Sequence, residues 1–574
     1  MPYYVQVTRE GRKGFARFSS SLQERLKSTG MVKQLTGYQL MLHDWATDRH
    51  VRVIRQMLVA EGGYDASQVR VSTTPTPELE RLDDRVSNPE GFASLSFGSD
   101  VAEHDPNLPL YFLHTDSYRN VVTGKRTLVI GPKGSGKTAI LQSLVNDVDS
   151  NYSVVITPER YARALLQDVL HGEAKTGADI HAFSATWTYT ILLEVFKQLL
   201  STKRGMRAGP LAPIHNYVRD HAVDANLDLL SRFVAFWKRI EGIKIASFEV
   251  SLKTKQLESL YKLQDLLALL PALSQAVGDR HFFVLVDELD QGWDNSRLAN
   301  DFLLSLLLTA LRLHAYKAGI RVVAFLRTEI FDILKGHFDQ LDKMRDAIEM
   351  LQWDRRSLAG LLTKRLQVSL GLRAALAPDA GIAALFPESP VRGGVDGFGY
   401  LTSRTSLRPR EVIQFSRLAH QEAMRQGGHV ISAGVIEIAE EQFSKWRAEH
   451  LCSEHLHILP GLEALLEKFR YGPAVYAYNQ LLSILESHLL EVCARGEPPE
   501  WLSAYDGHEV IRRLFEIGFV GFRYVATVGL KDAEPQRALW EQFAFAYSRP
   551  SAKIPRDSEF LIQPGFWKHL EVTV

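Results

Sequence analysis

The stretch of the sequence best suited to chemistry is glycine-rich and reads GPKGSGKTA over residues 131–139. It fits the pattern G-x-x-x-x-G-K-[ST], in which glycines let successive backbone N–H groups point at phosphate oxygens. The lysine can reach the β- and γ-phosphates of a nucleotide, and the threonine hydroxyl can coordinate Mg²⁺. We therefore predict a triphosphate site formed by Gly131, Pro132, Lys133, Gly134, Ser135, Gly136, Lys137, Thr138 and Ala139.

Two carboxylates, Asp287 and Glu288, follow the apolar run 282–286. An apolar run rich in aromatic and β-branched residues predicts a strand buried on both faces, which delivers functional residues at its carboxyl end. We predict that Thr138 and Asp287 hold Mg²⁺ and that Glu288 polarises an attacking water as the catalytic base. Together with Lys137, this pair predicts hydrolysis of the nucleotide rather than binding alone.

Arg327 is a third candidate, because it ends another apolar run at 320–326. If that strand lies beside the strand that carries the acids, Arg327 faces the γ-phosphate and reports its presence. The alternative is an arginine paired with Asp332 or Glu329 on the surface.

Arg408 and Arg410 are candidates on a second segment. Apolar residues at helical spacing after position 349 predict a helical lid, and Pro409 is placed to open one of its helices. The helix dipole disfavours cations at a helix start unless an anion compensates them. That anion is either a nucleotide phosphate or Glu411.

Other polar residues are interpreted as structural. Asp290 and Asp294 are expected to be a loop residue and a helix N-cap, because an apolar periodic segment follows them. Cys452, His455 and His457 have spacing that suggests a metal site, but no fourth ligand lies nearby in the sequence. We interpret these three as ordinary helix-surface residues.

The elements that must position the candidates predict an α/β fold. The apolar stretch 127–130 precedes the glycine-rich loop as a strand, and 139–145 follows it as a helix. We expect a P-loop NTPase core with a mostly parallel sheet, a helical lid and a winged-helix-like C-terminal domain. The expected boundaries are 1–85 for an N-terminal α/β region of unknown role, 86–350 for the core with a long helical insertion at about 150–280, 351–450 for the lid, and 451–574 for the C-terminal domain.

The C-terminal pattern bears on nucleic-acid binding. Residues 508–524, 541–548 and 558–570 predict a helix, two short strands and a terminal helix or turn, as in a winged helix. The helix carries only Arg512 and Arg513 as cations, and Lys plus Arg equals Asp plus Glu at 67 each over the whole chain. These are too few cations to bind the phosphates of DNA strongly, so a protein contact is favoured over DNA.

The cellular compartment is predicted from cysteine usage and hydropathy. Two cysteines without a CxxC pair fit a reducing compartment. The N-terminus has no apolar region typical of a secretory signal, and the most apolar helix candidate, 302–313, is shorter than the roughly 20 residues of a bilayer span. We expect a cytoplasmic protein with no membrane partner.

Four segments together resemble a known family: GPKGSGKT at 131–138, VLVDELD at 284–290, AFLRTEIF at 324–331 and LRPREVI at 407–413. They are similar to bacterial P-loop ATPases of the STAND and AAA+ grade, most closely to the KAP-like and origin-recognition-like branches, over roughly 95–450. The resemblance implies ATP and Mg²⁺ as ligands, a first-sensor role for Arg327, and a second sensor on the lid. An arginine at the first-sensor position, where AAA+ motors have another polar residue, favours a switch over a translocating ring.

Three functions stay open at this point. The resemblance implies an ATP-driven switch or homo-oligomerising regulator that acts on a partner protein, of the kind common in prokaryotic antiviral defence. A DNA-associated AAA+-like loader that grips duplex with its winged helix is the second possibility. A small-molecule or nucleotide kinase is the third, and Glu288 argues against it because a kinase excludes water activation at the γ-phosphate.

Overall fold

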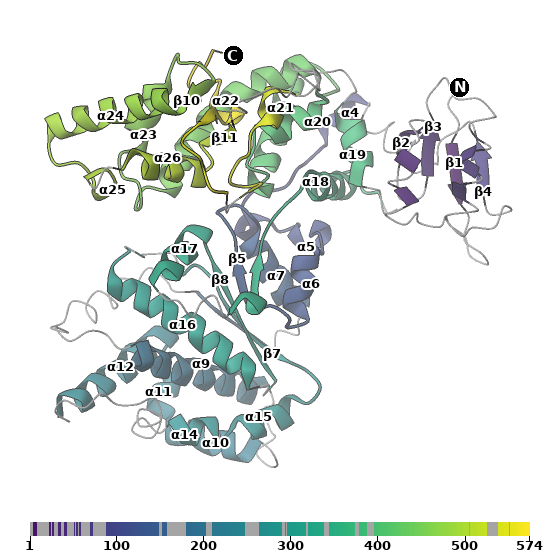
Figure 1. Ribbon diagram of the computed structural model, residues 1–574. Coiled ribbons are helices and arrows are strands. Elements are labelled where there is room, and N and C mark those ends of the chain that lie inside the picture. The colour runs from purple at the N-terminus through teal and green to yellow at the C-terminus, as the bar shows by residue number, and fades with distance from the viewer. Residues whose placement is uncertain are drawn as a thin grey trace. The chain divides into compact units, whose positions relative to one another are not determined.

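The structure is a computed structural model, shown in Figure 1. It describes short pieces of the first 86 residues and most of the chain after residue 88. The described ranges after position 86 are 88–147, 152–157, 180–202, 211–246, 263–289, 295–316, 319–337, 344–372, 378–386, 395–503, 506–524, 538–549 and 552–573, with the single residues 209 and 293. The chain divides into two compact units, one formed by His114–Gln352 and the other by Met1–Leu113 with Trp353–Val574.

The unit 114–352 is built on a five-stranded sheet with the order β6-β7-β8-β5-β9. Every strand pair in it is parallel. The strands are β5 (Leu128–Ile130), β6 (Ser153–Ile156), β7 (Phe282–Val286), β8 (Ile320–Leu326) and β9 (Ile348–Met350). The side chains of β5 and β7 are buried along the whole strand, as expected for a parallel sheet that is covered on both faces. The predicted α/β class with a mostly parallel sheet is confirmed.

The strand order places the ends of three strands next to one another. β8 lies between β5 and β7, and in register Ile130 pairs with Leu326 and Val286 with Ala324. Because all three strands run in the same direction, the residues that follow them lie at the same edge of the sheet. Gly131 N–H donates to Leu326 O at 3.2 Å and so extends the β5–β8 ladder by one residue.

Helices surround this sheet. Four of them flank its strands in sequence: α6 (Asp116–Val122), α7 (Lys137–Asp147), α16 (Arg297–Ala315) and α17 (Thr328–His337). In the described part of the chain, six more follow β6 and precede β7 in the sequence: α9 (Ile180–Thr202), α10 (Leu211–Asp220), α11 (Ala222–Asn226), α12 (Leu229–Ala246), α14 (Leu263–Leu267) and α15 (Leu270–Val277). α9 packs against α12 and α16 through aromatic rings, with Phe183 stacked 4.1 Å from Trp237. These aromatic stripes are therefore core, and β6, which sequence analysis did not single out, pairs with β7 at the start of the same region.

The other unit contains a separate antiparallel sheet near the N-terminus. Its order is β2-β3-β1-β4, formed by β2 (Val32–Leu35), β3 (Gln39–Leu42), β1 (Tyr4–Val7) and β4 (Val69–Ser72). Val5, Leu40 and Leu42 are fully buried in a small core of their own.

The helices of the expected lid belong to the same unit. They are α18 (Arg355–Ser369), α19 (Pro378–Leu385), α20 (Gly397–Ser403), α21 (Pro409–Arg425) and α22 (Ala433–Glu454). The segment before the glycine-rich loop, with α4 (Pro89–Ala93) and α5 (Leu108–Tyr111), packs on them: Lys364 Nζ donates to Phe112 O, and the buried Arg365 donates to Ser99 O at 3.1 Å. Residues 88–113 thus fold with these helices.

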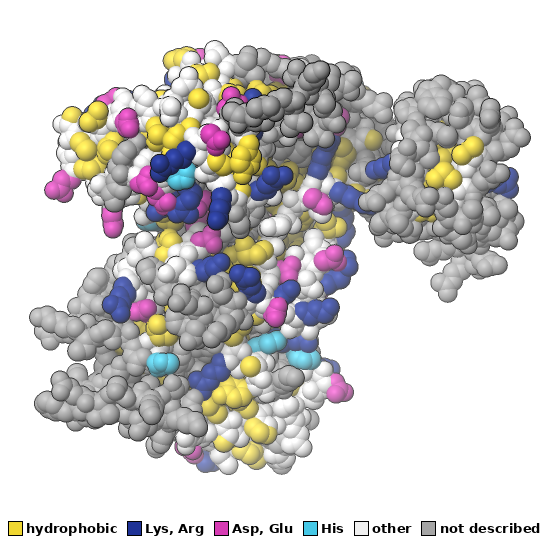
Figure 2. Space-filling model, in the orientation of Figure 1, with side chains coloured by type: hydrophobic (Ala, Val, Ile, Leu, Met, Phe, Trp, Pro, Cys, Tyr) yellow, Lys and Arg dark blue, Asp and Glu magenta, His cyan; other side chains and the backbone are white. Residues whose placement is uncertain are grey.

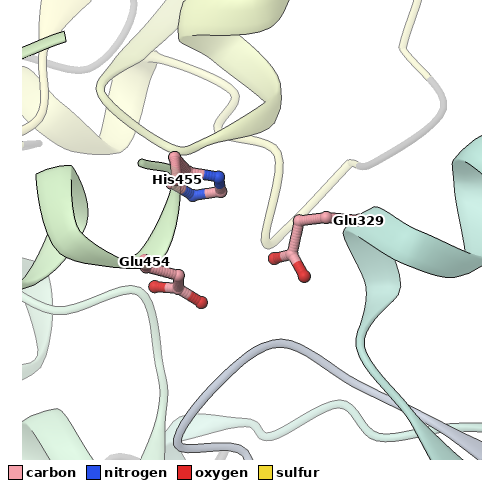
Figure 3. A group of neighbouring side chains, drawn as sticks. All are labelled: Glu329, Glu454 and His455. Carbon is pink, nitrogen blue, oxygen red and sulfur yellow. The ribbon is translucent and has the colours of Figure 1, made fainter. Parts of the chain in front are cut away.

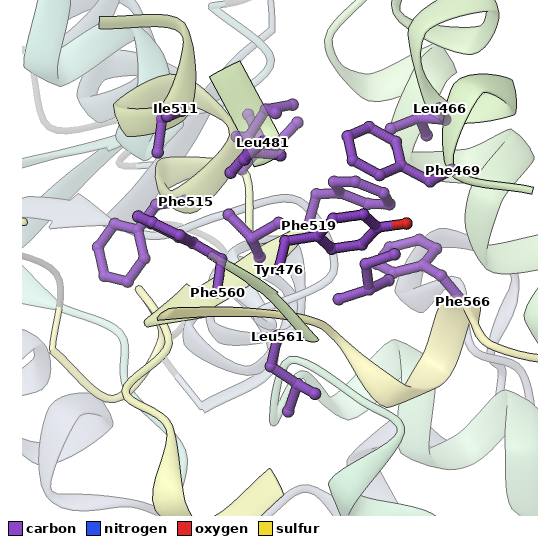
Figure 4. Packing of buried hydrophobic residues seen from close by; sticks show 14 of the residues in the cluster. Leu466, Phe469, Tyr476, Leu481, Ile511, Phe515, Phe519, Phe560, Leu561 and Phe566 are labelled. Carbon is purple, nitrogen blue, oxygen red and sulfur yellow. The ribbon is translucent and has the colours of Figure 1, made fainter. Parts of the chain in front are cut away.

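The C-terminal part of the unit is a small sheet packed on helices. Its elements are α23 (Leu462–Leu466), β10 (Val475–Ala477), α24 (Tyr478–Arg495), α25 (Glu500–Ser503), α26 (Gly507–Glu516), β11 (Val520–Tyr524) and β12 (Ser558–Ile562), and the antiparallel strand order is β10-β12-β11. Figure 4 shows apolar side chains of α24, α26, β10 and β12 packed together. Residues 541–548 form no strand, and Ala544 makes only an isolated bridge with Phe522.

Among the described residues, no helix combines the length and the apolar character that a bilayer crossing requires.

Candidate nucleotide-binding site

The loop between β5 and α7 has a backbone that only glycine adopts easily. Gly134 and Gly136 have φ angles of 80° and 97°, in the left-handed region that residues with a Cβ disfavour. At Gly131 the limit is space, because an added Cβ would lie 2.5 Å from Ser135 Oγ and 3.0 Å from Leu351 Cβ. The shape of the loop therefore requires a small residue at each of these positions.

Lys137 is the first residue of α7, and its side chain lies along the same loop. Its Nζ donates to Gly131 O at 2.8 Å and to Pro132 O at 3.1 Å. α7 has 11 residues, so the partial positive charge of its amino end adds to that of the lysine. The backbone and one side chain thus concentrate positive charge at the carboxyl edge of the sheet.

The glycine-rich loop is joined directly to the acidic strand end. Thr138 Oγ1 donates to Asp287 Oδ2 at 3.0 Å, although the two residues are 149 positions apart in the sequence. Asp287 N–H donates to Ile156 O at 3.1 Å, which fixes the aspartate at the end of the β6–β7 ladder. Its side chain is buried.

These two side chains fit a bound Mg²⁺. A hydroxyl and a carboxylate are the oxygen ligands that this ion prefers, and it is bound in nucleotide sites by one or two such groups together with phosphate oxygens. The hydrogen bond between Thr138 and Asp287 shows that both oxygens converge on one place. The structure thus brings together the two residues that were predicted to hold the metal.

Glu288 has a backbone conformation that is unusual for its residue type. Its φ angle is 58°, and its peptide N–H donates to Asp287 Oδ1 at 2.9 Å. A non-glycine residue in this region costs on the order of 1–3 kcal/mol and is found most often at functional sites. This turn ends the strand at once, and the Glu288 side chain is half-buried.

Arg327 directly follows β8, the strand between the glycine-rich loop strand and the acidic strand. Its carbonyl accepts from Phe331 N at 3.0 Å, so the same residue ends β8 and starts α17. The adjacency on which its predicted role depends is therefore present. Its side chain is half-buried.

Arg408 and Arg410 belong to the unit that contains the lid helices. Arg408 is the N-cap of α21 and Pro409 its first residue, as the sequence predicted. Arg408 NH1 donates to Glu454 Oε1 at 3.2 Å and Oε2 at 2.9 Å. Arg410 Nε donates to Asp100 O at 3.3 Å.

The carboxylate that compensates Arg408 is thus Glu454, which sequence analysis missed. Glu411, the partner suggested by sequence proximity, instead accepts from Ser406 N. Glu454 is buried at the carboxyl end of α22, where Figure 3 shows it beside His455. Burial alone would raise the Glu454 pKa, but the charges of Arg408, His455 and His450 lower it to about 2. A separation of 46 residues leaves no signal of this pair in a single sequence.

Of the remaining polar candidates, His457 is exposed as expected, but Cys452 is half-buried and His455 is buried beside Glu454, so His455 is not a helix-surface residue. Burial, followed by the charges of Glu463 and Glu467, raises the pKa of the Cys452 thiol to about 11. Among the side chains that the structure describes, Cys452 and His457 belong to no group close enough to bind a metal ion. Asp290 and Asp294 lie outside the described residues, and the N-cap of α16 is Ser296, whose Oγ accepts from Ala299 N at 3.2 Å.

Comparison with known proteins covers parts of this architecture. Residues 356–452 match the family of FunZ-associated C-terminal helical domains, a range that runs from α18 almost to the end of α22. A putative transposon gamma-delta 80.3 kDa protein of Escherichia coli (strain K12) is 23% identical over 498 residues, which cover 83% of this chain and 67% of that protein.

Two solved structures of the Aeropyrum pernix ORC2 protein also align with the chain. The ADPNP–ADP complexes align at 12% identity with a TM-score of 0.33, over 79% of this chain and 88% of theirs. The ADP form aligns at 13% identity with a TM-score of 0.26, over 79% of this chain and 89% of its own.

Proposed function

We propose that this protein binds ATP with Mg²⁺ between residues 131–139 and the pair Asp287–Glu288, hydrolyses it, and uses the cycle as a conformational switch on a partner protein. The observation that carries the proposal is the 3.0 Å hydrogen bond from Thr138 Oγ1 to Asp287 Oδ2. It joins a phosphate-binding loop to an acidic strand end, which is the arrangement that a metal–triphosphate requires. By the resemblance of its motifs, we place the protein among homo-oligomerising regulators of prokaryotic, anti-phage defence.

Each residue of the proposed site has a separate role in binding or hydrolysis. The backbone N–H groups of the loop, the amino end of α7 and Lys137 bind the phosphates. Thr138 and Asp287 hold Mg²⁺, which when bound neutralises charge on the phosphate oxygens. Glu288 orients a water molecule and accepts its proton as the water attacks the γ-phosphate. Arg327 senses the γ-phosphate from the end of β8, and Arg408 or Arg410 serves as the sensor of the lid.

Two variants test the proposal. Glu288→Gln should keep ATP binding but lower kcat by about 100-fold or more, because only the proton acceptor is lost. Lys137→Ala should weaken ATP binding at least about tenfold, because a charge-assisted contact to phosphate is lost. The measurements are phosphate release and binding of a fluorescent ATP analogue.

Matched controls come from exposed residues of the same types. Glu486→Gln on α24 and Lys125→Ala after α6 should leave both measurements unchanged. If Glu288→Gln retains the wild-type rate, the carboxylate is not the base, and if Lys137→Ala binds ATP normally, the loop is not the phosphate site.

A protein partner is favoured over DNA because the cations of α26 are neutralised within the helix. Arg512 donates to Glu509 and Glu516, with an NH1–Oε1 distance of 2.6 Å to the latter, and Arg513 lies 3.4 Å from Glu509. Around the place of α26, Figure 2 shows Lys and Arg side chains next to Asp and Glu side chains. We expect DNA affinity that is low and almost independent of salt, and a steep negative slope against log[salt] would instead support the DNA-loader function.

Release of phosphate from ATP without any added acceptor distinguishes the proposed ATPase from a kinase. We expect such release at a rate that depends on Glu288. A protein that consumes ATP only when an acceptor molecule is supplied would be a kinase.

A further inference from the structure

Residues 404–408, the turn between α20 and α21 that ends at Arg408, are largely buried and are held by several hydrogen bonds. Arg404, Thr405 and Ser406 are at most 8% exposed. Leu407 has a φ angle of 53°, so a non-glycine residue is held in the left-handed region. Such a conformation persists only where the surrounding structure fixes it.

Gln563, at the end of β12, supplies much of that fixation from the C-terminal part of the chain. Its Nε2 donates to Ser403 O at 3.0 Å and to Thr405 O at 3.1 Å. Its Oε1 accepts from Arg447 NH1 and from Gly565 N, each at 2.7 Å. The side chain is fully buried, and both amide protons and the oxygen are used. The pattern also fixes the amide orientation, because only the NH₂ group can meet two carbonyls.

Arg447 of α22 binds the same turn from a second side. Its NH2 donates to Ser406 Oγ at 2.8 Å, and its NH1 donates to Arg404 O. Burial lowers the pKa of this guanidinium. Gly565 lies so close to the turn that an added Cβ would collide with Arg404 O. The backbone around Gln563 and the backbone of the turn are thus in direct contact.

Arg404, inside the turn, adds a third connection to the C-terminal part. Its guanidinium carbon lies 4.5 Å from the Trp540 ring centroid and 5.6 Å from that of Trp567. Its Nε also donates to Glu440 Oε1 of α22 at 3.0 Å, which compensates the buried charge. Cation–π contacts of this kind stabilise the arrangement only while the rings keep their place.

We propose that Gln563 is a positioning residue that couples the C-terminal domain to Arg408. It holds the carbonyls of residues 403 and 405, and Arg408 N-caps the helix that begins after them. A shift of β12 relative to α22 would leave buried carbonyls without donors, so the turn must follow β12. A partner that moves the C-terminal domain would therefore move Arg408. This inference rests on the proposed function, with Arg408 rather than Arg410 as the sensor of the lid.

The test is a double-mutant cycle in the full-length protein. Gln563→Met keeps the side-chain volume and removes the donors, and Arg408→Lys keeps a charge opposite Glu454 and removes the planar guanidinium. We expect each to raise the KM for ATP about tenfold with a smaller change in kcat, and the double variant to match either single variant. Gln542→Met is the matched control, because Gln542 pairs with Arg523 within the C-terminal part and is expected to change nothing.

The outcomes separate this inference from the proposed function. Effects of Gln563→Met and Arg408→Lys that multiply to about 100-fold, or a folded Gln563→Met with the wild-type KM, would overturn the coupling while hydrolysis that depends on Lys137 upholds the ATPase. Hydrolysis that is absent in the wild type would overturn both. Should Gln563→Met fail to fold, Gln563→Glu replaces it, because a carboxylate keeps the acceptor for Arg447 and Gly565 and removes the donors to the carbonyls of residues 403 and 405. The same non-additivity with Arg408→Lys is expected.

Discussion

The two units hold their candidate residues by different physical means. In the unit 114–352 the backbone positions them, because Lys137, Asp287 and Arg327 each directly follow a strand end or a loop. Gly134, Gly136 and Glu288 have left-handed conformations that shape the turns beside these residues. In the unit with the lid helices, side-chain networks do it, with Arg408 held by Glu454 and Arg404 by Glu440. The first arrangement is therefore sensitive to added Cβ atoms and the second to loss of charge.

The largest effect is expected from breaking a buried ion pair of the lid unit. Glu454→Ala would leave Arg408, which is 12% exposed, without its carboxylate and should lower the free energy of unfolding by about 3–5 kcal/mol. Chemical denaturation followed by circular dichroism measures the loss. Glu441→Ala, at an exposed position of the same helix, should stay within about 0.5 kcal/mol of wild type. Equal stability of the two variants would show that the pair contributes nothing.

Acid should lower the stability of the same unit, because it protonates Glu454. Because the pKa of Glu454 is lowered from 4.5 to about 2, its stabilisation is complete above pH 4.5 and is lost as the pH falls towards 2. Thermal unfolding measured across this range should show a falling midpoint in the wild type. Glu454→Gln removes the titrating group and should flatten that fall. An unchanged slope would assign the acid sensitivity to other carboxylates.

The glycine-rich loop 131–139 should instead lose ATP affinity when one of its glycines is replaced. Gly136→Val places a β-branched residue at a φ angle of 97° and should weaken ATP binding by roughly 10- to 100-fold, from about 1–3 kcal/mol of strain. Binding of a fluorescent ATP analogue reports the change. Gly336→Ala is the control, because an added Cβ on this glycine of α17 meets nothing within 4 Å. Tight binding by Gly136→Val would show that the loop tolerates another shape.

The smallest effect is expected from a helix cap in the unit 114–352, where stability and catalysis should respond separately. Ser296→Ala removes the N-cap of α16 and should cost about 1 kcal/mol of stability without changing kcat for ATP. The change in stability is read from denaturant unfolding, and the rate from phosphate release. A loss of hydrolysis would mean that α16 takes part in positioning Asp287 or Glu288.

The sequence predicted those features that depend on local pattern. The apolar runs 282–286 and 320–326 form strands, because a short run of apolar residues is enough to indicate a buried strand. Pro409 begins a helix, because the proline ring fixes φ at a helical value. The short strand β6 was missed, since it has only four residues and Val155 within it is 41% exposed. Apolar residues alternate with others over 541–548, and this pattern predicted one of two short strands. The segment forms no strand, and Ala544 makes only an isolated bridge with Phe522.

The contacts that hold the lid arginines could not be predicted. Glu454 is 46 residues from Arg408, and Gln563 is 160 residues from Ser403, so only the folded chain brings them together. Glu288 likewise combines a left-handed conformation with a hydrogen bond from its N–H to the Asp287 side chain, and residue type alone indicates neither. By contrast, the glycine-rich motif and the acidic end of the apolar run 282–286 were enough to predict that Thr138 and Asp287 meet.

The most direct measurement of the central claim is a structure of the protein with Mg²⁺ and a nonhydrolysable ATP analogue. We expect the β- and γ-phosphates on the backbone N–H groups of residues 134–138, with Lys137 Nζ in contact and the metal beside Thr138 and Asp287. A nucleotide bound elsewhere, or a metal that contacts neither residue, would contradict the account.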